Sequence, residues 1–466
     1  MYKTLTKNIT YKILHQIILF IFPLILTPYI SRVLGVKSLG IYSFYYSISI
    51  YFSYLATLGI NIYGNRAIAQ VKENDKTLKK VFTNIYVLQF IASIISLLLY
   101  LIFILISKNK IISIIMIMNI LTSLFNINWF YFGQEKFKSV IFTQLIIKTL
   151  ITILIFVFVK NENSLIIYSI LKCSSDLIFN IILFIFSIKY IKFNNISKTS
   201  VKNNLKPCLL LFIPALATTI YQQTDKVMIG ILVNKTEVGY YECASKLITI
   251  TLGLVSAVLT VISPKMSDLT SRKKDDDSKK LFNNSINYIL CLATAISFGI
   301  ISISKEFVPL FFGSSYKSSI NLTINLAVSL LFVSFSNSLK LLYLIPKEKD
   351  KIYTNSVIYG TILNIILNYI LISKYNAMGA VISTVLTELF VLIYQILKIK
   401  NNLNLHNIIK NLIIYIIFGI IMYSIVSLVA TINMSLIYKT IVEILTGIIV
   451  YVTLCLIYFT KTKNKI

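Results

Sequence analysis

Long apolar runs separated by short polar segments fill almost the whole chain. Each run holds about 18 to 25 residues without clustered charge, which is the length that a helix needs to cross a bilayer. The pattern predicts about fourteen transmembrane helices, near residues 13–31, 41–63, 82–106, 111–132, 139–159, 164–188, 208–232, 240–263, 286–304, 320–345, 354–373, 378–397, 411–431 and 437–459. The predicted fold class is therefore an all-α polytopic membrane protein.

The amino-acid composition excludes a soluble enzyme. Of 466 residues, 57% are hydrophobic and only 13% are charged, with a mean hydropathy of +0.80. Soluble domains hold about 45–50% apolar residues, with glycine included in that share. No small-residue cleavage site follows the first apolar run, so we expect that run to be an uncleaved membrane span.

The excess of basic residues follows the loops. The chain holds 45 Lys and Arg against 17 Asp and Glu, a net charge of +28. With the N-terminus inside, 30 of the basic residues fall in inner segments, 10 in outer loops and five within spans. This asymmetry predicts a multi-pass protein with both termini in the cytoplasm and gives no reason to expect a nucleic-acid partner.

A weak internal repeat relates the first and seventh spans. Phe22-Pro23 leads to the segment 34–42, and Ile213-Pro214 leads to the segment 235–241. Because six helices separate the two copies, they share one orientation and form a parallel pseudo-repeat. The repeat predicts two six-helix lobes and two C-terminal helices, with boundaries 1–190 for helices 1–6, 207–400 for helices 7–12 and 410–466 for helices 13–14.

Two prolines mark each of these related regions. Pro23 and Pro28 lie in the first, and Pro207 and Pro214 lie in the second. We expect the first span to bend or break at its prolines, as helices do where they line a cavity. The alternative, a proline that only starts a helix, fits Pro207 well and Pro23 poorly.

Several motifs resemble those of a transporter family. They are the segments 27–36, 39–43 and 58–69 in the first half and 221–230 and 238–246 in the second. These segments resemble the polysaccharide flippases, the Wzx-type oligosaccharide flippase branch of the multidrug/oligosaccharidyl-lipid/polysaccharide (MOP) exporter superfamily. The resemblance extends over the whole chain in length and layout.

The resemblance implies that the protein flips an undecaprenyl-diphosphate-linked oligosaccharide from the inner to the outer leaflet of the cell membrane. Alternating access by rocking of the two lobes would expose a polar route to each face in turn. The same resemblance implies membrane lipid as a partner, and the polymerase and glycosyltransferases of the pathway as further ones. The sequence contains no phosphate-binding loop.

Three other functions remain open. An ion-coupled multidrug exporter of the same superfamily would favour acidic cavity residues, whereas four of the five in-span cations lie in spans five to eight. A membrane glycosyltransferase or polymerase would need a large outer loop with acidic catalytic residues. The outer loops of this chain are too short for that, so we expect no enzyme. A purely structural assembly protein would not need charges at mid-membrane.

The charged residues inside the spans are the candidate substrate path. Lys148 is too deep in its span to snorkel easily. Lys172 and Asp176 are four residues apart on one helix face, where they could line a cavity or form an internal ion pair. Asp225 and Lys226 point about 100° apart. The full set of predicted substrate-path residues is Arg32, Lys148, Lys172, Asp176, Asp225, Lys226 and Lys246.

Other polar positions are given weaker roles. Glu388, in mid-span without a local partner, is a candidate for ion coupling, and Glu242 is a candidate partner of Lys246. Glu443 and Lys340 lie near span ends, where solvation is the expected state. The second span is crowded with tyrosines, which we expect to anchor it at the membrane interface: Tyr42, Tyr45, Tyr46, Tyr51 and Tyr54.

No cofactor or metal site is predicted. The five cysteines lie far apart, mostly within apolar runs, and no Cys-x-x-Cys spacing or Cys/His cluster occurs in the sequence.

Overall fold

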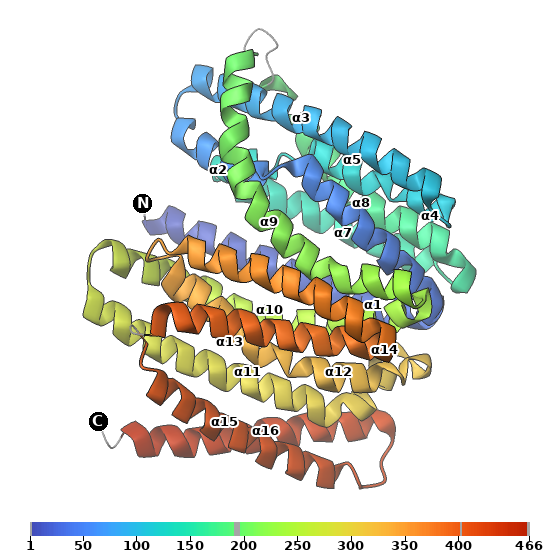
Figure 1. Ribbon diagram of the computed structural model, residues 1–466, viewed down its shortest axis with the longest axis vertical. Coiled ribbons are helices and arrows are strands. Elements are labelled where there is room, and N and C mark those ends of the chain that lie inside the picture. Colours follow the sequence, from blue (N-terminus) through green and yellow to red (C-terminus); the bar gives the residue numbers. More distant parts are fainter. Residues whose placement is uncertain (1, 191–195, 401–402, 464–466) are drawn as a thin grey trace. The chain divides into compact units, whose positions relative to one another are not determined.

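The computed structural model describes residues 2–190, 196–400 and 403–463, and all the regular elements in these ranges are helices (Figure 1). In chain order they are α1 (Tyr2–Thr57), α2 (Ile60–Val71), α3 (Asp75–Ile106), α4 (Lys110–Ile115), α5 (Ile117–Phe125), α6 (Asn128–Gly133), α7 (Phe137–Phe158), η1 (Glu162–Ser164), α8 (Leu165–Ser187), η2 (Ile188–Tyr190), α9 (Lys198–Leu232), α10 (Lys235–Ser271), α11 (Asp275–Phe312), η4 (Ser314–Tyr316), α12 (Ser319–Ala327), α13 (Ser329–Leu339), η5 (Lys340–Leu344), α14 (Asp350–Ile399), α15 (Leu405–Val429) and α16 (Leu436–Lys463). The predicted all-α fold class is confirmed.

Twelve helical segments among the described residues are long and apolar enough to cross a membrane. Two of them, Ile21–Val71 and Asp350–Ile399, are 51 and 50 residues long. A membrane crossing needs about 20 residues, so each has the length of two crossings. The protein is therefore a multi-pass membrane protein, whereas the number fourteen stays a prediction.

Each of these long segments contains a break in helical backbone. Gly35 has φ 70° and ψ 175° in α1, and Asn376 has φ 54° and ψ −136° in α14. Glycine and asparagine are the residues that enter positive φ at least cost. The backbone of α1 stays helical at Pro23 and Pro28, so these prolines do not break the helix, and the interruption lies at Gly35. A bend at the prolines stays a prediction.

The chain divides into two compact units, Met1–Gly230 and Ile231–Ile466. The first contains α1 to α8 and nearly all of α9. The second contains α10 to α16. The division into parts at 1–190, 207–400 and 410–466 stays a prediction.

Serines let the helices of the first unit approach closely. Ser47 and Ser49 of α1 and Ser93 and Ser96 of α3 are almost completely buried. Ser96 donates a hydrogen bond to the carbonyl of Phe52 in α1 at 2.5 Å, whereas Ser47 donates to Gln223 of α9 and Ser49 accepts from Asn119 of α5. Small residues at helix contacts are the usual solution in lipid, because van der Waals packing rather than the hydrophobic effect holds membrane helices together.

A buried glutamine joins α3 to the interrupted helices that follow it. The Gln89 amide donates to the carbonyls of Ser123 and Asn126, and its oxygen accepts the indole N–H of Trp129 at 2.9 Å. These carbonyls lie at the end of α5, where the helical hydrogen bonds stop. Gln89 therefore satisfies backbone groups that the break between α5 and α6 leaves unpaired.

The backbone of α9 crosses the turn between α1 and α2. Gly59 has φ 73°, and a Cβ added there would lie 2.6 Å from the carbonyl oxygen of Cys208 and 2.9 Å from the amide nitrogen of Phe212. No side chain fits in this space. The motif glycine at 59 is therefore required both by its backbone conformation and by the close approach of α9.

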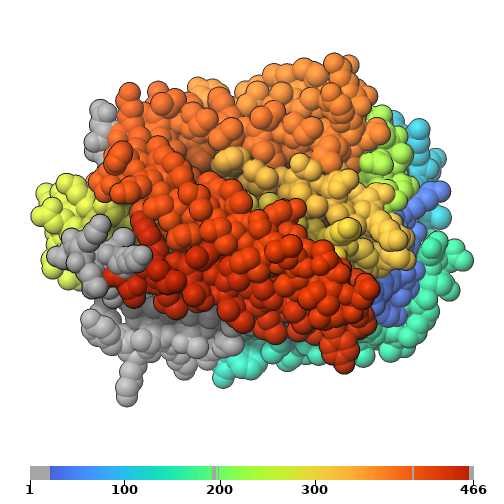
Figure 2. Space-filling model, turned by 90° about the horizontal axis from the view of Figure 1, so that it is seen from below, coloured from blue at the N-terminus to red at the C-terminus, as the bar shows by residue number. Residues whose placement is uncertain are grey.

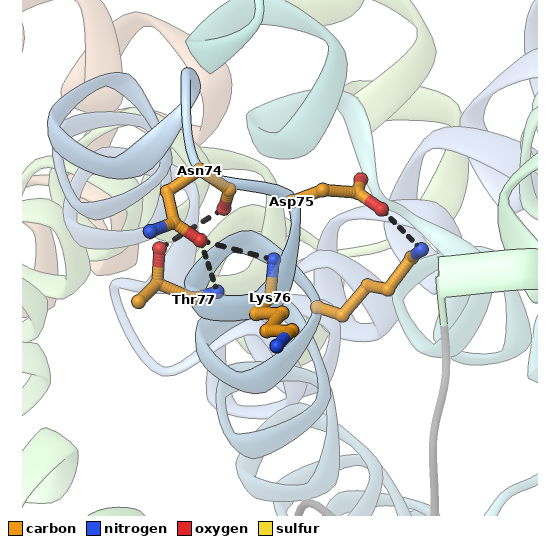
Figure 3. Close-up of polar contacts among 5 residues, drawn as sticks. Asn74, Asp75, Lys76 and Thr77 are labelled. Atoms are coloured by element: carbon orange, nitrogen blue, oxygen red, sulfur yellow. Dashed lines mark hydrogen bonds and ion pairs between the residues drawn. The ribbon is translucent and has the colours of Figure 1, made fainter.

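Helix α3 begins at a side-chain cap (Figure 3). The Asn74 side chain accepts hydrogen bonds from the backbone amides of Lys76 and Thr77, at 3.1 and 3.2 Å. Asp75 pairs with Lys79 one turn later. The cap and the acidic first turn stabilise the positive end of the helix dipole, which explains why the helix starts here after the polar loop.

Polar side chains also join the two limbs of α14 in the second unit. Asn368 donates to the side chain of Asn364 at 3.0 Å, and Ser383 donates to the Asn364 carbonyl at 3.2 Å. All three residues are fully buried. The break at Asn376 lies between Asn364 and Ser383, so the Ser383 hydrogen bond joins the two limbs, whereas the Asn368 bond lies within the first limb.

Helices α15 and α16 contact each other and α11 at the edge of the second unit. Figure 2 shows them in shades of red across the face seen from below. Exposed isoleucines and leucines, such as Ile413, Ile420, Leu445 and Ile449, lie along both helices. Such apolar surfaces fit a lipid environment.

Candidate functional site

The structure brings three of the predicted charged residues together in the first unit. Lys148 lies on α7, and Lys172 and Asp176 lie on α8, which packs against α7. Counted along the helices at about 1.5 Å per residue, they lie about 10 to 17 Å from the helix ends that η1 connects. All three are therefore well inside their membrane helices.

These three groups interact electrostatically. The charges of Asp176 and Lys148 both act on Lys172, and all three side chains are half-buried. In the described part of the chain no ion pair within 4.0 Å joins either lysine to Asp176. Two basic residues and one acidic residue give the group a formal charge of +1, and no internal salt bridge joins them.

Two tyrosines, Tyr42 on α1 and Tyr168 on α8, lie beside this group. The rings of Tyr42 and Tyr168 meet edge to face with their centroids 4.9 Å apart, and the charge of Asp176 acts on Tyr42. We call Tyr42, Tyr168, Lys148, Lys172 and Asp176 the first-unit polar cluster. It combines two lysines and an aspartate well inside the helices of one unit with two aromatic rings, of which that of Tyr168 lies near the start of α8.

The tyrosine prediction for the second span is partly wrong. Tyr42 and Tyr45 are only 6% and 4% exposed, so they are packed inside the unit and do not anchor it in the headgroup region. The ring of Tyr46 stacks on that of Tyr42, with centroids 5.6 Å apart. Tyr54 is 40% exposed. The sequence did not show which helix face is turned inward.

Asp225 is buried in the first unit. It is 5% exposed, and its charge acts on the Tyr51 hydroxyl, which lies 3.2 Å from the Thr224 hydroxyl. Lys226, the next residue, is half-buried. The structure therefore separates the environments of the two residues, as their predicted angle around the helix implies.

Arg32 lies at a different level of the unit. Arg32 is exposed and lies three residues before the break at Gly35. A Cβ added at Gly35 would lie 3.1 Å from a carboxylate oxygen of Glu162. Arg32 is not among the charges that act on Lys172. The structure thus places Arg32 near the end of a limb, outside the first-unit polar cluster.

The remaining predicted residues belong to the second unit. Lys246 on α10 and Glu388 on α14 are half-buried, and these helices contact each other. The Tyr241 hydroxyl lies 3.3 Å from that of Thr384, one turn from Glu388. Both Lys246 and Glu388 interact with other groups, and the role of Glu388 in ion coupling stays a prediction.

Sequence reasoning missed a buried acidic position. Glu443 on α16 is 0% exposed, which contradicts its expected solvation near a span end. Lys439, one turn earlier, pairs with Glu306 of α11 at 3.0 Å. The four-residue spacing of Lys439 and Glu443 was the available signal. Lys340, also assigned to a span end, donates to the Tyr353 hydroxyl at 2.9 Å.

One charged contact lies outside the membrane-spanning segments of the first unit. Lys72, at the end of α2, donates to Glu135 at 2.7 Å. This hydrogen bond and the charge of the carboxylate raise the pKa of Lys72 above its usual value. Among the residues whose side chains are described, no three His, Cys, Asp or Glu lie close enough together to hold a metal ion.

Curated relatives of the chain are named as transporters of glycans. The probable low-salt glycan biosynthesis flippase Agl15 of Haloferax volcanii is 29% identical over 171 residues, which cover 36% of this chain and only 35% of that protein. A putative O-antigen transporter of Shigella dysenteriae is 23% identical over 387 residues, which cover 82% of this chain and 96% of the relative.

Solved structures share the fold. The lipid II flippase MurJ, in an inward closed conformation, matches with a TM-score of 0.63 and 18% identity over 93% of this chain and 98% of MurJ. An inward-facing multidrug resistance transporter of the MATE family, in the MOP superfamily, matches with a TM-score of 0.61 and 14% identity over 84% of this chain and 95% of that one. At these identities the likeness concerns the fold alone.

A family match agrees with the motifs in the sequence. Residues 5–270 match the family described as polysaccharide biosynthesis protein. This range covers more than half of the chain and includes the whole first-unit polar cluster. The chain therefore belongs to the polysaccharide biosynthesis protein family, within the fold shared by MOP-superfamily flippases and exporters.

Proposed function

We propose that the protein moves a polyprenyl-diphosphate-linked oligosaccharide from the inner to the outer leaflet of the cell membrane by alternating access. The observation that carries this proposal is the first-unit polar cluster, two lysines and one aspartate well inside the helices with two tyrosine rings beside them. Family membership and the flippases among the relatives support it.

The chemistry of the cluster suits this substrate. A diphosphate carries negative charge that must be balanced inside the membrane, and ammonium groups donate charge-assisted hydrogen bonds to phosphate oxygens. Lys148 and Lys172 supply two such cations. Asp176 offsets part of their mutual repulsion when no substrate is bound. The rings of Tyr42 and Tyr168 offer apolar faces and hydroxyls to a sugar.

The other predicted residues extend this proposal. Asp225 and Lys226 on α9, Lys246 on α10 and Arg32 at the end of the first limb of α1 would line the rest of the substrate path. Glu388 is the candidate for ion coupling. We infer cytoplasmic termini from the distribution of Lys and Arg, and a polymerase and glycosyltransferases as pathway partners.

The test is made in a deletion strain. Membrane lipids are extracted, the polyprenyl-diphosphate-linked oligosaccharide is quantified, and its leaflet is determined by access of an external glycan-modifying enzyme. We expect accumulation in the inner leaflet, restored by re-expression. Unchanged amount and sidedness would overturn the proposal.

Point variants test the site. Lys148→Ala should lower export at least about tenfold, since a tenfold loss corresponds to only about 1.4 kcal/mol of a charge-assisted contact. Lys138→Ala is the matched control, because Lys138 lies on the same helix near its start and is exposed. Export by Lys148→Ala equal to that of the control, at equal membrane levels, would remove Lys148 from the site.

An ion-coupled multidrug exporter is the second candidate, because the MATE fold matches nearly as well as MurJ. A cationic drug would need net negative charge, whereas the first-unit polar cluster is net positive. This candidate predicts that deletion raises sensitivity to cationic drugs without changing the lipid-linked oligosaccharide.

A further inference from the structure

A buried acidic group lies between α11 and α16, apart from the first-unit polar cluster. Glu306 and Glu443 are 6% and 0% exposed, and Lys439 is the only cation that the structure shows paired with Glu306 among the described residues. Lys439 and Glu443 are one turn apart on the same face of α16. The charges of Glu306 and Lys439 act on Glu443.

Glu443 has no hydrogen-bond partner for either carboxylate oxygen among the described residues. The neighbouring Thr440 hydroxyl is already used, because it donates to the Leu436 carbonyl at 2.8 Å. An ionised carboxylate that is fully buried without donors is strongly disfavoured, and such a group binds a proton instead.

The surrounding helices supply no further charge. On α11 the neighbouring Lys305 is exposed to the surroundings of the protein. The side of α15 that faces α16 presents Met422 and Val426, which lie 3.6 Å from a Cβ built at Gly447. The titratable groups of α15 are His406 and Lys410 near its start, Tyr415, which is fully buried, and Tyr423, which is 43% exposed.

The balance of charge in this group also favours a protonated carboxyl group. With both glutamates ionised, the group of two carboxylates and one ammonium would carry −1 in a buried place. One bound proton makes it neutral. We propose that Glu443 is a proton-binding site that controls the ion pair between α11 and α16.

The pair can exist in two arrangements. With Glu443 protonated, Lys439 pairs with Glu306 and connects α16 to α11, as seen here. When Glu443 loses its proton, it becomes a second partner for Lys439 on the same helix, and the connection to α11 weakens. The proton is the only species exchanged, and no bond other than the carboxyl O–H forms or breaks.

Infrared difference spectroscopy on the full-length protein in lipid nanodiscs tests the proposal directly, whether or not the proposed flipping is correct. At neutral pH we expect the C=O stretching band of a protonated carboxylic acid. Glu443→Gln should lower this band by the intensity of one carboxyl group. Glu348→Gln is the matched control, because Glu348 is exposed in the loop before α14, and it should leave the band unchanged.

A second variant separates protonation from misfolding. Glu306→Gln frees Lys439 to pair with Glu443, so the same band intensity should be lost at neutral pH although Glu443 is present. Retention of the band in both variants would overturn the proposal. Loss of the wild-type band when choline is replaced by Na⁺ would also overturn it, because the site would then bind sodium.

Discussion

The crossing of α9 over Gly59 leads to a prediction about stability that is specific to one methyl group. In Gly59→Ala the added Cβ would have to lie 2.6 Å from the Cys208 oxygen and 2.9 Å from the Phe212 nitrogen. Both are backbone atoms of a helix, so neither can rotate away. Helix α9 must therefore move, and with it the segment that holds Asp225.

The size of the effect follows from two contributions. Placing alanine at φ 73° costs about 1–2 kcal/mol. Forcing a carbon into a filled contact costs about 1–3 kcal/mol more. We expect the free energy of unfolding of Gly59→Ala to fall by about 2–5 kcal/mol in total.

The single tryptophan makes this measurable. Trp129 lies in the same packed cluster as Ile60 and Cys208, so its fluorescence during thermal unfolding in detergent reports on this region. The control is Gly299→Ala in α11, where an added Cβ meets no atom within 4 Å. We expect a clearly lower unfolding temperature for Gly59→Ala only. Equal temperatures for both variants would refute the close approach.

Three further predictions follow from single contacts. The Cys291 and Cys455 sulfurs are 3.4 Å apart, so a mild copper oxidant should join them in a disulfide. The number of thiols that a labelling reagent modifies in the unfolded protein should then fall by two, and serine at either position should prevent this decrease. Trp129→Phe leaves the Gln89 oxygen unpaired and should lower the free energy of unfolding by about 1–3 kcal/mol, measured by circular dichroism; an unchanged value would show that this bond contributes nothing. The pKa of Lys72 is raised in the folded state, so its ion pair contributes stability below the unfolded pKa and loses it as pH rises through the folded one. The difference in unfolding temperature between wild type and Lys72→Met should therefore persist at neutral and mildly alkaline pH and vanish at strongly alkaline pH.

Several features of the candidate site could be read from the sequence because they depend on spacing along one helix. Lys172 and Asp176 share a face of α8, and Lys148 lies deep in α7, as predicted. That Lys172 feels both charges depends on the packing of α7 against α8, which periodicity along one helix does not reveal. Their roles in transport stay predictions.

The burial of Glu443 shows the opposite case. Its distance from the span end suggested solvation, because depth is the only property that a hydropathy pattern measures. The packing of α11, α15 and α16 around it decided otherwise. A helix end is solvated only where no neighbour covers it, and the neighbours are not visible in one segment of sequence.

The pattern of apolar runs along the chain was enough to establish the class of the protein. Runs of apolar residues long enough to span a bilayer allow only a helical membrane fold, since every backbone group in lipid must be satisfied within its own helix. The motifs in segments 27–36 and 58–69 and in their second-half counterparts indicated the family.

The tertiary structure alone decided which side chains meet. Whether a tyrosine of the second span faces lipid or packs inside, and whether a glutamate is solvated or enclosed, depends on the rotation of each helix and on its neighbours. It also decided that α1 is interrupted at Gly35 and stays helical at its prolines. Local sequence sets the propensity to form a helix, whereas contacts between distant helices fix its rotation, its interruptions and the chemistry of its buried groups.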